Sequence, residues 1–187
     1  GREAVKTEYD EAGRLKKTAN ASGNGVEFVY NPANSLETVK DALGNATTYE
    51  YDVRGNVVTE VDANGGITRR TYDDDTNMLS ETDAEGSTKS YTYDSSKNRL
   101  TETDGLGNTT RYTYNQFGFV TQKVNALGQT TKYEYDAKGN QTATINAIGK
   151  TTSVFNASGQ ITSIVDDKGQ ATNFLYDSLG RVTSKID

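Results

Sequence analysis

The feature that most constrains this chain is a short phrase, Asp or Asn followed by two residues and Gly, that recurs about every ten and a half residues. Asp52–Gly55 and Asp62–Gly65 are two consecutive copies. Seventeen sites of this kind run from Asp10 to Asp177, and fourteen of them have Gly in the fourth place. In the other three the fourth place is held by Asn34, Thr76 and Lys97. A chain punctuated so often has no segment long enough for an ordinary helix.

The chemistry of the phrase predicts a tight turn at each site. Asp or Asn at the first position of a type I turn accepts backbone N–H bonds, and the residue that follows the turn enters left-handed space, which Gly enters at little cost. This is the hairpin loop with a Gly bulge. Asn34 is expected to adopt the same conformation, and at the other two sites Asn77 and Asn98 are expected to take over the role of Gly.

Two turns make one repeat, because an aromatic residue followed by Asp or Asn precedes every second turn. The steps between these aromatic residues are 21 residues, with one of 20. The sequence therefore predicts a single array of about nine repeats over residues 1–187. The aromatic positions are Tyr9, Tyr30, Tyr51, Tyr72, Tyr93, Tyr114, Tyr135, Phe155 and Tyr176.

The six or seven residues between turns alternate in polarity, as half-buried strands do. Counting back from each Asx, the first, third and fifth residues tend to be apolar or aromatic, as in Tyr51, Tyr49 and Thr47 or in Val61, Thr59 and Val57. We expect these to share one face, which we call the tyrosine face. The predicted fold is all-β: a continuous antiparallel meander of about 18 short strands, forming a curved or spiralling open sheet.

An odd repeat of 21 residues would turn every second tyrosine to the opposite face unless each repeat contains one extra residue. We expect a three-residue loop, Val53–Gly55, after the Tyr-Asp pair and a four-residue loop, Ala63–Gly66, after the other Asp. At the 20-residue step, a three-residue loop Ala147–Gly149 is expected to keep Thr151, Ser153 and Phe155 on the tyrosine face.

The same count places four cations, Lys17, Lys40, Arg70 and Lys89, on the tyrosine face. A dry core does not tolerate several unpaired charges, whereas a wall in contact with water does. No helical segment is predicted that could cover this face, so the mixed lining indicates a wet surface. A β-propeller is a rival fold for strands of this length, but its period would be four strands and this pattern closes after two.

Composition excludes several classes of function. The hydrophobic fraction is 33%, and the chain has no Trp, Cys or His. A net charge of -6 disfavours nucleic acid and anionic membranes as partners. No run of apolar residues is long enough to predict membrane insertion. Without His or Cys, and with nearly every repeated Asp in a turn, no catalytic constellation is recognisable, so we expect no enzyme. The run Asp73-Asp74-Asp75 is read as a solvated turn in preference to a cation site, and no metal or cofactor is expected.

Three stretches are similar to a known family: "YDSLGRVT" at 176–183, "YDEAGRL" at 9–15 and "DGLGNTTRYTYN" at 104–115. They resemble the RHS or YD-repeat proteins, which include bacterial polymorphic toxins, toxin-complex subunits and teneurins. The resemblance implies a β-shell that encloses a toxin or other C-terminal cargo. It further implies that the partners of this chain are the remaining repeats and that cargo, and that the parent protein is secreted or lies at the cell surface. The family's Asp-Pro closing region has no counterpart, since Pro32 is the only proline. We therefore expect a fragment of shell wall.

The tyrosine face has a second interpretation, because regularly spaced aromatic rings also stack on sugars. An extracellular adhesin or carbohydrate-binding module is thus the alternative to a shell wall. Against it, a three-residue loop sets Tyr51 opposite Val57 and Tyr176 opposite Val182, where the rings stabilise the sheet. The terminal strands of an isolated fragment also predict edge-to-edge self-association.

The residues on which the repeat depends are the turn caps, the turn glycines and the aromatic positions beside them. We single out Tyr9, Asp10, Gly13, Tyr51, Asp52, Gly55, Asp62, Gly65, Tyr91, Tyr93, Asp94, Asp104, Gly107, Tyr112, Tyr114, Tyr133, Tyr135, Asp136, Gly139, Tyr176, Asp177 and Gly180.

Overall fold

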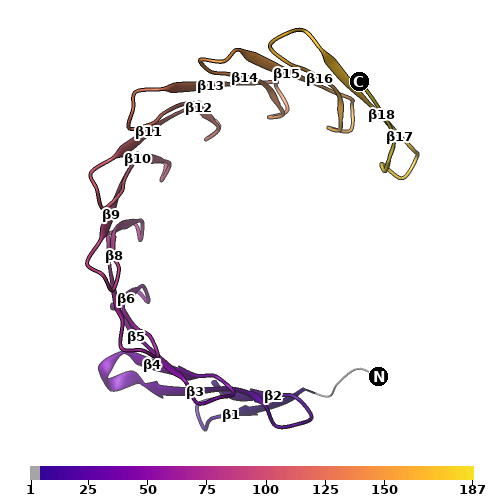
Figure 1. Cartoon of the computed structure of the whole chain (residues 1–187). Helices are drawn as coiled ribbons and strands as arrows, with labels where there is room; N and C mark the ends of the chain where they lie inside the picture. The colour runs from indigo at the N-terminus through magenta and orange to yellow at the C-terminus, as the bar shows by residue number, and fades with distance from the viewer. Residues whose placement is uncertain (1–4) are drawn as a thin grey trace. The chain divides into compact units, whose positions relative to one another are not determined.

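The computed structural model describes residues 5–187 and confirms an all-β fold of eighteen short antiparallel strands (Figure 1). One 3-10 turn, η1 (Pro32–Asn34), is the exception. The strands are β1 Lys6–Tyr9, β2 Leu15–Ala19, β3 Gly25–Asn31, β4 Leu36–Lys40, β5 Ala46–Tyr51, β6 Val57–Val61, β7 Ile67–Tyr72, β8 Met78–Thr82, β9 Thr88–Tyr93, β10 Arg99–Thr103, β11 Thr109–Tyr114, β12 Val120–Val124, β13 Thr130–Tyr135, β14 Gln141–Ile145, β15 Lys150–Phe155, β16 Ile161–Val165, β17 Ala171–Tyr176 and β18 Val182–Ile186.

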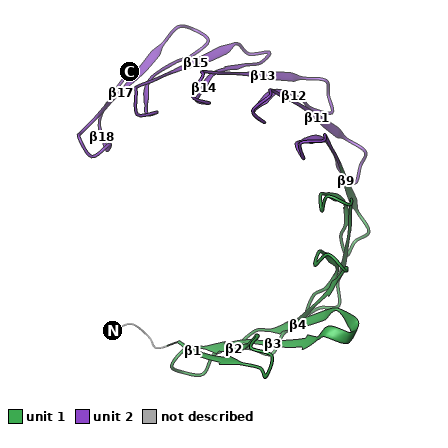
Figure 2. Cartoon of the chain, turned by 180° about the vertical axis from the view of Figure 1, so that it is seen from behind, with its two compact units in different colours: residues 1–91 green, residues 92–187 purple. Residues whose placement is uncertain are grey.

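The chain divides into two compact units, residues 1–91 and 92–187 (Figure 2). In the first unit each strand from β1 to β8 pairs with the strand that follows it, and in the second unit the same holds from β10 to β17. Figure 2 shows each unit as a bent, single-layered ribbon of strands. Each unit is therefore a meander in which sequence neighbours are also spatial neighbours.

A single layer leaves little room for a core. Among the described residues only Ala19 and Ala143 are buried, with 9% and 3% of their surface exposed. The strand residues are mostly half-buried, because each packs only against its neighbours on the same face. Cross-strand pairs and ladder hydrogen bonds, summed over the repeats, must therefore carry the stability.

Both kinds of turn close in the same way. The Asp52 N–H donates to the Asn56 carbonyl at 2.9 Å, and the Gly55 N–H donates to the Asp52 carbonyl at 3.0 Å. The turn at Asp62 has the same two bonds, with Gly66 as the acceptor at 2.9 Å. The loops are thus equal in length, and the prediction of a longer four-residue loop at Ala63–Gly66 is wrong.

The extra residue of each repeat lies instead in a strand. Tyr51 pairs with Val57, but the next pair is Glu50 with Thr59, so Val58 has no partner and forms a β-bulge. The same shift follows the Tyr-Asp turns in β1–β2, β7–β8 and the corresponding hairpins of the second unit. The Asx turn has a fixed hydrogen-bonded size, so the residue that restores the alternation is accommodated in the strand.

The β3–β4 hairpin is the exception to this rule. Its register runs without a shift from Glu27↔Lys40 to Asn31↔Leu36, because the additional residue is contained in the turn with η1. The left-handed residue there is Ser35, with φ 53°, and not Asn34 as expected from the sequence. The Ser35 N–H closes the turn on the Pro32 carbonyl at 3.3 Å.

The short repeat behaves as the sequence predicts. The Asn146 N–H donates to the Gly149 carbonyl at 3.0 Å, which makes this turn one residue shorter than the others. Tyr133 pairs with Thr144, and Thr144 pairs with Thr151 on the next strand. Thr151, and with it Ser153 and Phe155, therefore stays on the tyrosine face, as predicted.

The bulge changes which residues of the even strands share the tyrosine face. Tyr49 pairs with Glu60, which places Glu60 on that face and moves Thr59 and Val61 to the opposite face, whereas Val57 pairs with Tyr51 and stays on the tyrosine face, as predicted. Lys17 and Lys40 both pair with Glu27, the neighbour of Phe28, so both lie on the opposite face and their predicted placement is wrong. Arg70 and Lys89 both pair with Glu81 and lie on the tyrosine face, as predicted.

Two turns without Gly are strained. Thr76 and Lys97 themselves adopt left-handed backbone, each with φ 65°, so the prediction that Asn77 and Asn98 take over this role is wrong. Those asparagines instead donate their side-chain amides to Asp73 Oδ2 at 2.8 Å and to Asp94 Oδ2 at 2.9 Å. A β-branched residue is especially disfavoured in left-handed space.

Replacing Thr76 with Gly is therefore expected to stabilise the protein. Relief of the left-handed strain outweighs the extra entropy of Gly in the unfolded chain, for a net gain of about 0.5 to 1 kcal/mol in the free energy of unfolding. Urea denaturation measures the change. Ser96→Gly is the control, because Ser96 lies in an equivalent turn without a positive φ and should lose stability. Equal losses in both variants would contradict the strain at Thr76.

Candidate functional site: the tyrosine-flanked turns

The aspartate cap Asp52 holds its turn through both carboxylate oxygens. Asp52 Oδ1 accepts the backbone N–H groups of Arg54 and Asn56, each at 2.9 Å, and Oδ2 accepts the Asn56 side-chain amide at 2.9 Å. These bonds favour the charged form, so the Asn56 amide and backbone together hold the pKa of Asp52 below its usual range. Both oxygens of the Asp52 carboxylate therefore accept hydrogen bonds from residues of the same turn.

The same arrangement recurs with little variation along both units. Asn98, Asn108 and Asn140 donate to the caps Asp94, Asp104 and Asp136, and the pKa of each cap is lowered chiefly by that side-chain bond. At Asp10 and Asp177 the donors are Arg14 and Arg181, whose backbone bonds are the largest cause of the lowered pKa.

The tyrosines of the Tyr-Asp pairs join neighbouring strands through their hydroxyl groups. The Tyr72 hydroxyl donates to the Val57 carbonyl at 3.1 Å, and the Tyr135 hydroxyl donates to the Val120 carbonyl at 2.8 Å. Each acceptor is the first residue of the preceding strand, 15 residues earlier in the chain. The equivalent pairs are Tyr30 with Leu15, Tyr114 with Arg99 and Tyr176 with Ile161. Sequence reasoning placed the rings but not these bonds.

Tyr51 differs because the turn before it contains η1. Its hydroxyl donates to Glu37 Oε2 at 2.6 Å instead of to a backbone carbonyl. Burial, followed by the bond to Glu37, raises the pKa of Tyr51 to about 12. The Tyr51 hydroxyl still links two neighbouring hairpins, but its acceptor is a side-chain carboxylate and not a backbone carbonyl.

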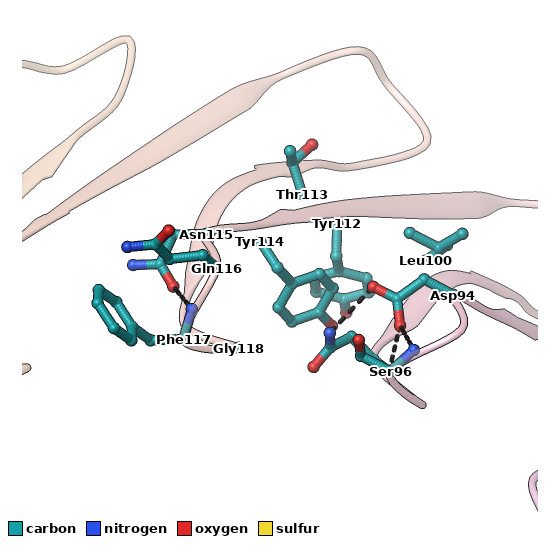
Figure 3. Close-up of a pocket in the computed structure, with 11 residues that line it drawn as sticks. Asp94, Ser96, Leu100, Tyr112, Thr113, Tyr114, Asn115, Gln116, Phe117 and Gly118 are labelled. Carbon is teal, nitrogen blue, oxygen red and sulfur yellow. Dashed lines mark hydrogen bonds between the residues drawn. The ribbon is translucent and has the colours of Figure 1, made fainter.

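A groove of about 590 Å³ lies between two adjacent turns of the second unit (Figure 3). Figure 3 shows the rings of Tyr112 and Tyr114 beside the Asp94 turn, with Phe117 at the other end of the groove. Arg99 and Lys123 lie 5.3 and 5.9 Å from the centroid of the Tyr112 ring. They come from β10 and β12, on either side of β11, so protein cations occupy positions that a stacked sugar ring would need.

Neighbouring turns also contact one another. The Phe119 ring stacks on Tyr135, with centroids 5.1 Å apart and planes at 22°, and its edge lies against Gly139 of the next turn. Phe119 follows the turn Gly, at a place where most other turns have Asn, Gln or Arg. Sequence reasoning missed this residue, although its departure from the repeat was a visible signal.

In the first unit, Arg70 on the tyrosine face is paired with two carboxylates of the same face. Arg70 donates to Glu60 at 3.0 Å and to Glu81 at 2.8 Å. Asp73 accepts the backbone N–H groups of Asp75 and Asn77, so it acts as a turn cap, while Asp74 pairs with Arg54 at 3.2 Å. Within residues 5–187 no group of three acidic side chains could hold a metal ion.

The residues singled out from the sequence do not converge on one point. Each set of tyrosine, cap and glycine builds its own turn, and the sets follow one another along the units. Tyr9 is 63% exposed in β1, Tyr91 and Tyr93 lie in β9, and Tyr133 lies in β13. Gly13, Gly55, Gly65, Gly107, Gly139 and Gly180 all have positive φ. The arrangement supplies hydrogen bonds and packing, repeated along the sheet.

These features define a class of protein, a tandem β-hairpin repeat scaffold. The Teneurin YD-shell family matches residues 61–187, and the RHS Repeat family matches residues 30–67. Since the first match covers more than half of the chain, this chain belongs to the RHS/YD-repeat family and is part of a structural shell scaffold. No curated protein sequence matches it significantly.

Solved structures with a similar fold come from toxin complexes. TcdB2-TccC3 without its hypervariable C-terminal region has a TM-score of 0.68 at 14% identity, covering 97% of this chain and 13% of that one. The Photorhabdus luminescens Tc holotoxin pore has a TM-score of 0.66 at 16% identity, with coverages of 97% and 14%. TcdB2-TccC3-TEV has a TM-score of 0.62 at 15% identity, with coverages of 97% and 14%. This chain spans about one seventh of those chains.

The described residues include no helix long and apolar enough to cross a membrane.

Proposed function

We propose that this chain is a segment of the wall of a larger RHS/YD shell, and that the parent polypeptide uses the shell to enclose a toxin or other cargo segment of its own. The observation that carries the proposal is the uniformity of the repeat. Cap carboxylates and tyrosine hydroxyls are engaged in the same internal bonds from one repeat to the next. Such groups hold a wall together and leave no distinct chemistry at any one repeat.

The chemistry of the tyrosine face supports a wall in contact with water. Arg70, Glu60 and Glu81 are partly exposed and paired, and Lys123 lies beside Tyr112. Charges in this state keep much of their hydration, so no dry second layer is required on this face. We place the parent protein outside the producing cell or at its surface, and we propose no catalytic role for these repeats.

The carbohydrate-binding alternative is less well supported. Tyr112 lies between two cations, Tyr135 is stacked by Phe119, and the hydroxyls of Tyr114 and Tyr135 donate to backbone carbonyls. A sugar would have to compete with each of these contacts. The ring positions therefore favour cohesion between strands.

Protease protection in the full-length parent chain tests the proposal. The segment enclosed by the shell is expected to survive trypsin while an added, unenclosed tag is removed. Thr131→Pro breaks the β13 ladder and should expose the cargo, whereas Ser158→Ala, at an exposed turn, is the control. Digestion of the cargo in the unaltered chain, or unchanged protection in Thr131→Pro, would overturn the proposal.

A further inference from the structure

The dipeptide Asn-Gly occurs twice in this chain, at Asn24–Gly25 and at Asn64–Gly65. An asparagine followed by Gly is prone to lose its side-chain amide, because no Cβ on the next residue obstructs the approach of its backbone nitrogen to the Asn Cγ. Both asparagines are exposed to solvent. The two sites differ in how the structure holds the peptide group that reacts, so one molecule contains a comparison of the two.

Asn64–Gly65 lies in the open turn between β6 and β7. Gly65 has φ 85°, and a Cβ there would meet no atom within 4 Å, so the space beside it is empty. Among the hydrogen bonds of residues 5–187, Asn64 takes part only through its backbone N–H, which donates to Asp62 Oδ1 at 2.8 Å. The Asn64 side chain is therefore free to rotate. The Gly65 nitrogen is held by one bond, to the Asp62 carbonyl at 3.0 Å.

The cap of this turn is also held less firmly than its neighbours. In the preceding turn of the same kind, the Asn45 side-chain amide donates to Asp41 Oδ2 at 2.7 Å. Gly66 stands at the equivalent place after Gly65 and has no side chain, so Asp62 receives only backbone N–H groups, through Oδ1. Opening an exposed turn costs far less free energy than opening a strand. We therefore expect the Gly65 nitrogen to be released often.

Asn24–Gly25 is held much more tightly. Gly25 is the first residue of β3 and pairs with Ala19, one of the two buried residues among those that the structure describes. The two strands lie so close that a Cβ on Gly25 would overlap the Thr18 carbonyl oxygen. The Asn24 carbonyl accepts the Asn20 N–H at 2.9 Å. Reaction at this site requires the end of the β2–β3 ladder to separate.

We propose that Asn64 is a site of spontaneous deamidation. The deprotonated Gly65 nitrogen attacks Asn64 Cγ, so that a bond forms between these two atoms while the bond from Cγ to Nδ2 breaks and the amide leaves as ammonia. The product is a cyclic succinimide. Water then opens the ring at either carbonyl and leaves aspartate or isoaspartate at this position. The reaction needs only water and base.

Both products alter the turn in which they form. Isoaspartate carries the main chain through the former side chain and adds an atom to a turn that closes from the Asp62 N–H to the Gly66 carbonyl at 2.9 Å. Either product also adds a carboxylate to a groove of about 510 Å³ that Asp41 and Asp62 already line. Like charges repel in this position, so deamidation weakens the turn between β6 and β7.

Incubation of the whole chain in mildly alkaline buffer, followed by peptide mapping with mass spectrometry, tests the proposal. In the folded protein Asn64 is expected to lose its amide at least about tenfold faster than Asn24. In concentrated urea the two rates should agree within about twofold, because neither peptide group is then held. Circular dichroism before and after incubation checks that the folded sample stays folded.

Leu43→Asn is the matched variant. Leu43 is 88% exposed at the same turn position, and the change places the sequence Asp-Ala-Asn-Gly of residues 62–65 at residues 41–44, under a cap that Asn45 holds. The introduced amide is expected to be lost at least about threefold more slowly than that of Asn64 in the folded protein, and at the same rate in urea.

Two results would overturn the proposal: Asn64 keeps its amide in the folded protein while it loses it in urea, or Asn24 and Asn64 react equally fast in the folded protein. Equal rates at Asn64 and at the position changed by Leu43→Asn would overturn the role assigned to the missing cap donor.

Discussion

Raising the pH from 8 to 12 is expected to unfold this protein cooperatively. Burial is the largest cause of a raised pKa at five tyrosines whose hydroxyls donate to the sheet: Tyr30, Tyr51, Tyr72, Tyr114 and Tyr135. Because the pKa of each of these tyrosines is higher in the folded state, the stabilisation from the neutral hydroxyl is complete below the unfolded-state pKa of 10.0. It is lost as the pH rises through the folded-state pKa, which is about 12 for Tyr51. The loss therefore falls between pH 10 and 12.

The size of this effect follows from the number of bonds. Each neutral hydrogen bond contributes about 1 kcal/mol, so the loss of five approaches the total stability of about 5 to 15 kcal/mol usual for a domain. The ionised hydroxyls also lie opposite carbonyl oxygens or, for Tyr51, a carboxylate, which adds repulsion. Absorbance of tyrosinate and far-ultraviolet circular dichroism, recorded together against pH, should change in one step.

A reciprocal pair of substitutions isolates the hydroxyl contribution. Tyr135→Phe removes the bond to Val120 and is expected to cost about 1 kcal/mol at pH 8. Phe155 occupies the corresponding place in its repeat, and Gln141 is the first residue of the preceding strand β14, so Phe155→Tyr is expected to donate to the Gln141 carbonyl and gain a similar amount. Two results together would contradict this account: all tyrosines titrate near pH 10 without unfolding, and Tyr135→Phe leaves the free energy of unfolding unchanged.

Gly139→Ala is expected to be the most damaging single methyl addition among the turn glycines that have a positive φ. Gly139 has φ 85°, and a Cβ there would lie 2.7 Å from Phe119 Cζ. Left-handed backbone costs an L-residue about 1 to 2 kcal/mol, and displacing the Phe119 ring from Tyr135 adds about 1 kcal/mol, for a total of about 2 to 3 kcal/mol. Urea denaturation measures the loss.

Two further variants separate the two causes. Gly128→Ala shares the positive φ, at 76°, but its Cβ would meet no atom within 4 Å, so only the backbone cost of about 1 to 2 kcal/mol is expected. Phe119→Asn supplies the residue type that most often follows a turn glycine, and it should remove the steric part in the Gly139→Ala background. Equal losses at Gly128 and Gly139 would show that the ring contact has no energetic role.

The sequence predicted the fold well because its turns are local. An Asp or Asn cap and a left-handed residue close a turn through atoms of five consecutive residues, so the pattern fixes the turn without knowledge of distant strands. Those turns determine the number of strands and the pairing of Tyr51 with Val57. They also determine which residues share the tyrosine face after the short repeat at Gly149. The left-handed residues at Ser35, Thr76 and Lys97 were misassigned, because turn closure takes priority over the preference of a nearby Asn for that conformation.

The details of the site could not be predicted in the same way. Whether the odd residue of a repeat enters a loop or a strand depends on pairing with the neighbouring strand, and that choice moved Lys17, Lys40 and Val61 to the other face. The acceptor of each tyrosine hydroxyl lies 15 residues away in the chain, at a carbonyl whose position the bulge sets. The stack of Phe119 on Tyr135 joins two repeats and depends on how adjacent turns pack.

By itself the sequence determined where this chain turns, how many strands it forms and to which family of repeats it belongs, because those properties rest on bonds within a few residues. Only the tertiary structure decided which side chains share a face and which carbonyls receive the tyrosine hydroxyls. These properties depend on register between strands, and register is set by contacts that no single turn contains.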